Sequence, residues 1–281
     1  MSVFDLLSRT ESTLLVLALV LYLCAMLGLW AQLFLRPDAP AQSTLAAKWN
    51  RALLWAGALL HALSLLGQGG ALFTVKVGVV GLFGWILMLA FLIFGARAAR
   101  SNALGAFVTP VVLVATLYSL AAPLLHRFTP AEQLAVPWLV THVVIILIAY
   151  VALAFAFAAS LLYLLQESLL KRKKLGPLWQ KLPSLQVADE WIYRATTFGL
   201  AALTVGFAIG VLWLREHPGY TAMRDPQVLV SIATWLTFAI YLGARWKLGW
   251  RGRKSNLVVV GGFVLMAISL LGTPHLLNGI S

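Results

Sequence analysis

Residues 137–165 read PWLVTHVVIILIAYVALAFAFAASLLYLL and contain no Asp, Glu, Lys or Arg. An uncharged apolar run longer than roughly 18 residues is typical of a helix that crosses a membrane. Lipid offers no hydrogen-bond partner to an unpaired backbone amide, so a run of this kind has to be helical. This stretch therefore predicts an all-α integral membrane protein.

The composition of the whole chain agrees with this prediction. Of its 281 residues, 61% are hydrophobic and 11% are charged, and the mean hydropathy is +0.90. Soluble domains have roughly 45–50% apolar and about 25% charged residues, so a soluble fold is excluded. The single cysteine, Cys24, excludes an internal disulfide and a cysteine metal cluster. The N-terminus carries Asp5 and Glu11 and lacks the basic start of a cleaved signal peptide, so we expect the first apolar run to stay in the mature protein.

Apolar runs recur along the chain and divide it into eight predicted spans. Most are close to the roughly 20 residues that cross a bilayer core, and the fifth is long enough to tilt or project. We expect a single polytopic membrane domain over residues 1–281, built as a bundle of about eight transmembrane helices. The predicted spans are about 12–35, 52–70, 74–95, 103–124, 137–165, 196–214, 228–246 and 256–275.

The positive charge is distributed as in a membrane protein. The net charge is +12. With Arg245 at the end of the seventh span counted, 16 of the 21 Lys and Arg residues lie in one set of alternate loops: 36–51, 96–102, 166–195 and 247–255. Lys and Arg concentrate in cytoplasmic loops, so both termini are predicted to lie outside. This pattern accounts for the charge without a nucleic-acid partner.

The longest polar segment is predicted to be an inner amphipathic loop over residues 166–195. Its Lys and Arg cluster favours binding to anionic lipid headgroups. A short helix lying in the interface is suggested by its apolar residues. A docking site for a soluble protein is the alternative, and the sequence leaves both open. The apolar residues are Trp179, Leu182, Leu185, Val187 and Trp191.

Polar side chains within spans are the candidates for function, because burying them in lipid is costly. His142 lies near the outer end of the fifth span, His275 closes the eighth, and His61 is midway along the second. Neutral imidazole is a good ligand for heme iron, and outer-face arginines could pair with heme propionates. A helix-to-helix hydrogen bond is the alternative role for a buried His. The candidate propionate contacts are Arg127, Arg215 and Arg224.

Other classes of function are disfavoured. No hydrolase, kinase or dinucleotide motif is present, and we predict that the protein is not an enzyme. No acidic residue lies in the middle of a span, which argues against cation-coupled transport. The small-residue pair Gly206 and Gly210 indicates close helix packing.

Three stretches resemble the cytochrome c assembly family, which includes CcsA-type and HemX-type membrane proteins. They are PWLVTHVVIILIAYVALAFAFAASLLYLLQESLLKRKK, LPSLQVADEWIYRATTFGLAALTVGFAIGVLW and DPQVLVSIATWLTFAIYLGARWKLGWRGRK. The resemblance covers nearly all eight spans. It implies a multi-pass protein of the bacterial cytoplasmic membrane that handles heme, with heme b as the expected cofactor.

Residues 217–235, HPGYTAMRDPQVLVSIATW, lie where CcsA-type proteins carry a tryptophan-rich motif that holds heme at the outer face. Gly219, Asp225, Pro226 and Trp235 stay in register with that motif, but its other tryptophans are replaced. DPQVLVS is similar to the degenerate motif of the HemX-type branch. His142 matches the outer axial His of CcsA-type proteins, Gly243 replaces a membrane His, and His275 lies near a second outer His.

The resemblance implies a HemX-like accessory protein of heme biosynthesis or cytochrome c assembly, with heme at the outer face. HemX-type proteins are associated with heme biosynthesis, including control of the amount of glutamyl-tRNA reductase. The expected partners are the lipid bilayer and either a soluble heme-biosynthesis enzyme or a membrane protein of cytochrome c assembly. One alternative is a heme-delivery subunit of a cytochrome c synthase with His142 and His275 as axial pair. The other is a heme-free scaffold for a soluble partner.

Overall fold

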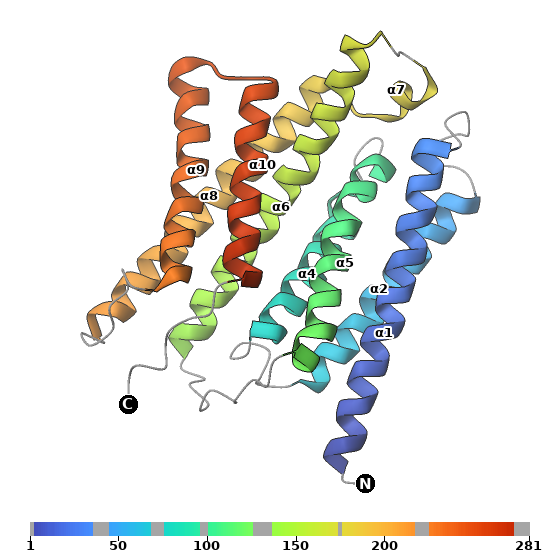
Figure 1. The fold of residues 1–281 in the computed structure, drawn as a ribbon, viewed down its shortest axis with the longest axis vertical. Coiled ribbons are helices and arrows are strands. Elements are labelled where there is room, and N and C mark those ends of the chain that lie inside the picture. The colour runs from blue at the N-terminus through green and yellow to red at the C-terminus, as the bar shows by residue number, and fades with distance from the viewer. Residues whose placement is uncertain are drawn as a thin grey trace. The chain divides into compact units, whose positions relative to one another are not determined.

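A computed structural model describes residues 3–35, 45–68, 76–95, 101–125, 137–173, 176–216 and 225–272. These residues are helical apart from short turns and include no strand (Figure 1). They divide into two compact units, one formed by residues 1–135 and 165–184 and the other by residues 136–164 and 185–281. The candidate residues His142, Asp225 and Trp235 belong to the second unit, and His61 belongs to the first.

Among its described residues, the first unit contains four long helices and two short ones. Tyr22 of α1 packs against Gly57 of α2, and the indole of Trp85 on α4 donates to the carbonyl of Ala58 at 2.9 Å. The hydroxyl of Ser119 on α5 donates to the carbonyl of Val77 at 2.9 Å, so small and polar residues set the helix contacts, as in other membrane bundles. The elements are α1 (Val3–Trp30), the π-helix η1 (Ala31–Leu35), α2 (Leu45–Gly67), α4 (Lys76–Ile93), α5 (Ser101–Leu125) and α7 (Pro177–Lys181).

The second unit is built from α6 (Pro137–Lys171), whose last residues belong to the first unit, α8 (Leu185–Glu216), α9 (Pro226–Leu248), α10 (Arg253–Ala267) and the π-helix η4 (Ile268–Gly272). The rings of Phe157 on α6 and Phe263 on α10 stack with centroids 3.9 Å apart. Gly262 of α10 packs against the ring of Phe238 on α9. Aromatic and glycine contacts therefore join α10 to both neighbours.

Six of the described helical segments are long and apolar enough to cross a membrane: Thr10–Leu35, Asn102–Ala121, Val140–Lys171, Leu185–Leu212, Pro226–Leu248 and Arg253–Leu271. The chain is therefore an all-α multi-pass membrane protein. Val77–Ile93 is a shorter apolar helix, and α2 is not among the six. A helix lies at each of the eight predicted spans, and the count of eight membrane crossings stays a prediction.

The segment 166–195, predicted as an inner loop, is largely helical. α6 continues to Lys171 and α8 already begins at Leu185, so Val187 and Trp191 belong to the long helix α8. Only Trp179 lies in a separate short helix, α7. The physical reason is that residues 185–198 contain no proline or glycine to end a helix. The carboxylate of Asp189 in this stretch is also neutralised by a guanidinium from α9.

Candidate functional site

The imidazole of His142 is held between α6 and α8. Its Nδ1 lies 3.0 Å from the carbonyl oxygen of Gly206. A carbonyl oxygen only accepts hydrogen bonds, so Nδ1 carries the proton and Nε2 carries the lone pair. In metal-binding histidines this arrangement fixes the ring and its tautomer while the second nitrogen ligates the metal. The geometry of His142 is therefore compatible with an iron ligand, and it also satisfies the alternative role of a bond between helices.

Two glycines of α8 make this contact possible. A Cβ added to Gly210 would lie 3.3 Å from Cε1 of His142, and one added to Gly206 would overlap the Ile146 side chain. A side chain at Gly206 would require Ile146 to move, and one at Gly210 would press on the ring of His142. The predicted role of the glycine pair in close helix packing is confirmed.

Gly206→Ala is expected to lower the free energy of unfolding by about 1–2 kcal/mol, because the added methyl group crowds Ile146. The matched control is Gly243→Ala on α9, where an added Cβ meets no atom within 4 Å. This control is expected to stabilise the protein by up to about 1 kcal/mol through helix propensity. Thermal unfolding in detergent measures both variants. Equal effects of the two substitutions would contradict the packing role of Gly206.

Asp225 and Pro226 form the N-terminus of α9. The Asp225 carboxylate accepts a hydrogen bond of 2.8 Å from the backbone N–H of Gln227, and Pro226 occupies the first turn. Asp is a strong N-cap residue and Pro suits the first helical position. Asp225 is buried, with 1% of its surface exposed. Its structural role as a helix cap is sufficient to explain its place in the motif.

Asp225→Ala is expected to destabilise the protein by about 1 kcal/mol, because the side-chain cap is lost. Asp225→Asn retains an oxygen that can accept the same bond and should stay within a few tenths of a kcal/mol of wild type. Thermal unfolding again provides the measurement. If Asn were as disruptive as Ala, the negative charge rather than the cap would be the essential feature.

Trp235 points its polar edge at α8. Its indole Nε1 donates to the hydroxyl of Thr204 at 2.8 Å. This bond ties α9 to α8 about two and a half turns from the beginning of α9. Like Asp225, Trp235 therefore has a structural partner of its own in the second unit.

The remaining predicted site residues are not brought together with His142. Arg215 is exposed in the last turn of α8, where a cation complements the helix dipole. It makes no hydrogen bond or ion pair with another described residue. The other predicted residues fall outside the described ranges: Arg127, Gly219, Arg224 and His275.

His61 lies on α2 of the first unit and is completely buried. Its ring meets that of Tyr22 edge-on with centroids 6.1 Å apart. Neither ring nitrogen has a hydrogen-bond partner among the described residues. The ring has no exposed surface that iron could approach, so the packing does not favour His61 as a heme ligand.

Three hydroxyl residues of the second unit were missed by sequence reasoning. Ser231 of α9 and Ser269 of η4 have their oxygens 2.9 Å apart, and the hydroxyl of Tyr150 on α6 donates to Ser269 at 3.5 Å. The π-helical turn η4 contains Ser269. Small hydroxyl residues in apolar helices were the available signal, but helix order along the chain does not say which of them meet.

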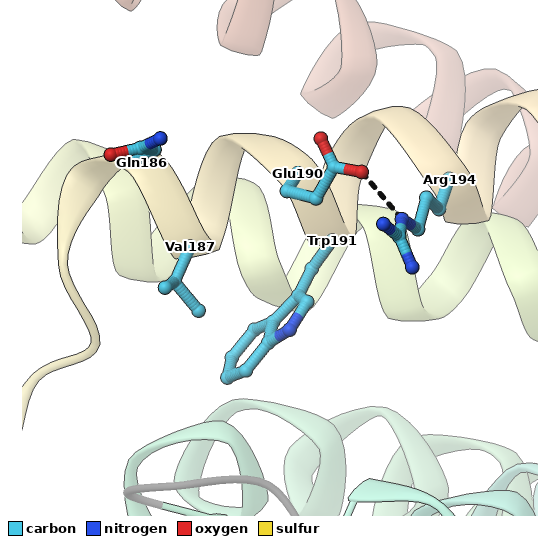
Figure 2. Close-up of a pocket in the computed structure, with 5 residues that line it drawn as sticks. All are labelled: Gln186, Val187, Glu190, Trp191 and Arg194. Carbon is cyan, nitrogen blue, oxygen red and sulfur yellow. Dashed lines mark hydrogen bonds and ion pairs between the residues drawn. The ribbon is translucent and has the colours of Figure 1, made fainter.

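A shallow cavity of about 350 Å³ lies along the first turns of α8, away from the predicted site. Figure 2 shows that its five lining residues come from this one helix, with Glu190 paired to Arg194. The described part of the chain has no cluster of three or more His, Cys, Asp or Glu residues able to hold a metal ion. The cavity lining is Gln186, Val187, Glu190, Trp191 and Arg194.

Comparison with known proteins identifies relatives for most of the chain. The Cytochrome c biogenesis protein CcsA of Chlorella vulgaris is 29% identical, covering 70% of this chain and 72% of that protein. The CcsA of Mesostigma viride is 27% identical, covering 64% of this chain and 66% of that protein. Protein HemX of Brevibacillus brevis is 30% identical over 48% of this chain and 49% of that protein.

No solved structure matches the chain. The sequence pattern of the family described as cytochrome C assembly protein matches residues 75–281, which include all helices from α4 to α10. The chain therefore belongs to the cytochrome c assembly protein family.

Proposed function

We propose that the chain is a non-enzymatic, HemX-like membrane protein of heme biosynthesis or cytochrome c assembly that holds heme at the outer membrane face through His142. The observation that carries the proposal is the bond between His142 Nδ1 and the Gly206 carbonyl. This bond supports the proposal because it orients the imidazole and leaves Nε2 as the nitrogen that would coordinate iron. The family relationship supports a role in cytochrome c assembly or a related process, and the His142 side chain supports heme binding.

The described residues offer one candidate ligand for the heme iron and one candidate partner for a propionate. His142 would hold the iron, and Arg215, exposed at the end of α8, would be a candidate partner for a propionate. When bound, heme supplies an iron that accepts one or two axial side chains. Arg127, Arg224 and His275 stay candidates outside the described residues.

The proposal includes the predicted topology of eight spans with both termini outside a bacterial cytoplasmic membrane. A helix at each of the eight predicted positions supports it, as does the concentration of Lys and Arg in alternate loops. In this topology His142 lies five residues after the first residue of α6. At a rise of 1.5 Å per residue, it is about 7–8 Å below the outer end of that helix.

An accessory role is favoured over heme delivery by the motif residues. Asp225 is used as a helix cap, and the indole nitrogen of Trp235 is used to bond Thr204. Gly243 stands where the resemblance expects a membrane His. The other tryptophans of the motif are replaced in this chain, so these residues do not form a stacking surface of several tryptophans. This difference disfavours heme delivery and supports an accessory role.

The test is removal of the protein from cells, followed by complementation with wild type or His142→Ala. We expect c-type cytochromes to persist while heme precursor levels change, and only wild type should restore those levels. Loss of all c-type cytochromes would overturn the accessory role in favour of heme delivery. Complementation by His142→Ala as effective as by wild type would favour a heme-free scaffold.

A further inference from the structure

The connection between α9 and α10 carries a cluster of exposed basic and aromatic residues, here called the basic turn. No Asp or Glu occurs anywhere in residues 226–281, so the positive charge has no carboxylate neighbour along this part of the chain. Arg245 is not part of the cluster, because Asp189 already neutralises it. The basic turn consists of Trp246, Lys247, Trp250, Arg251, Arg253 and Lys254, all of them exposed.

The backbone of the basic turn has a defined conformation. Gly249 has a φ of 64°, and the N–H of Trp250 donates back to the carbonyl of Ala244 at 3.2 Å. Gly252 has a φ of 79°, and its carbonyl accepts from the side-chain amide of Asn256 at 2.9 Å. Two glycines in the left-handed region allow this tight reversal. The cations are therefore presented by a hydrogen-bonded turn.

The first turn of α10 carries positive charges and no acidic or capping side chain. Arg253 and Lys254 occupy its first turn, and Gly252 has no side chain to cap it. Cations at a helix N-terminus oppose the helix dipole, which favours anions there. α9 begins with Asp225, whose carboxylate meets the same requirement. An external anion at the basic turn would supply the charge that the chain itself lacks.

The tryptophans place this turn at a membrane surface. It connects Pro226–Leu248 and Arg253–Leu271, two of the membrane-spanning helices. Trp246 is 63% exposed. Its indole donates to the hydroxyl of Tyr193 at 3.1 Å, and this bond orients the side chain. Trp and Tyr are enriched at the level of lipid headgroups. The anion within reach at that level is a lipid phosphate.

We propose that the basic turn binds the phosphate of an anionic phospholipid. Arg251, Arg253 and Lys254 contact the phosphate, and Trp246 and Trp250 lie beside the upper acyl chains. Arg offers a planar set of donors that matches phosphate oxygens. The site is independent of heme and of His142.

The test measures lipid binding to the full-length protein in detergent by native mass spectrometry, with phosphatidylglycerol and phosphatidylcholine as probes. The variant is Arg251→Gln, Arg253→Gln and Lys254→Gln together. Each Lys or Arg beside an anionic surface contributes about fivefold to binding, so we expect the preference for phosphatidylglycerol to fall at least about tenfold. The matched control removes three exposed charges elsewhere, as Lys48→Gln, Arg51→Gln and Arg194→Gln, and should keep the preference.

Three results would overturn the proposal: an unchanged preference in the turn variant, an equal loss in both triple variants, or displacement of the lipid by inorganic phosphate. The charge-preserving pair Arg251→Lys and Arg253→Lys shows whether the turn still folds. We expect that pair to bind phosphatidylglycerol within about threefold of wild type, since one positive charge remains at each position.

Discussion

Asp189→Asn is expected to lower the free energy of unfolding by about 3 kcal/mol, the largest stability effect of a single substitution that we predict. Both oxygens of Asp189 accept from the guanidinium of Arg245, at 2.9 and 2.7 Å. The side chains are only 17% and 9% exposed, and the guanidinium also lies 4.7 Å from the ring centroid of Tyr193. Neutralising Asp189 leaves the charge of Arg245 buried without its counter-ion.

The adjacent Glu190→Gln provides a matched control. Glu190 pairs with Arg194 within one helix, and these side chains are 47% and 77% exposed. Exposed pairs of this kind contribute little, so we expect a change within about 0.5 kcal/mol. Thermal unfolding in detergent measures both variants. If Asp189→Asn were as mild as Glu190→Gln, the pair would not be required for joining α8 to α9. The double variant Asp189→Leu with Arg245→Met should recover much of the loss, since no unpaired charge remains.

His142→Ala is expected to weaken heme binding by at least about tenfold, the largest functional effect that we predict. Changes to groups that merely orient a metal ligand cost about 10–100-fold in affinity, and loss of the ligand itself should cost no less. Titration of the purified protein with ferric heme gives the affinity directly. The substitution removes the bond to Gly206 as well, so thermal unfolding of the same sample is needed to show that the helices still pack.

His61→Ala is the control for a histidine inside a helix. His61 is buried against Tyr22 in the first unit, and we expect this variant to bind heme with wild-type affinity. A loss of affinity in His61→Ala with none in His142→Ala would move the heme site to the α1 and α2 helices. It would also contradict the assignment of His142.

The helices were largely predictable because apolar runs report them directly. The predicted span 137–165 lies within α6, and the predicted span 228–246 lies within α9. The extent of helix within 166–195 was not predictable from hydropathy. Its charged residues indicated a connection between spans, but Asp189 is paired with Arg245, 56 residues away in sequence. Ion pairing of this kind depends on which helices are neighbours, and the hydropathy of the sequence does not predict that.

The candidate site was predictable in its residue types but not in its contacts. His142 and the glycines of α8 were identified as a His in a span and a packing pair, yet nothing in the sequence joins them. The cap formed by Asp225 could have been found, since Asp followed by Pro is a signal for a helix N-terminus. The bond from Trp235 to Thr204 depends on how α8 and α9 are rotated against each other, which sequence order leaves open.

The most direct measurement is an absorption spectrum of the purified full-length protein reconstituted with ferric heme, for wild type and His142→Gly, before and after addition of imidazole. We expect a Soret band in wild type, a much weaker band in His142→Gly, and recovery when imidazole occupies the space of the lost side chain. Recovery would show that iron ligation, rather than helix packing, is the role of His142. An identical Soret band in both proteins without imidazole would contradict the assignment of His142 as the heme ligand.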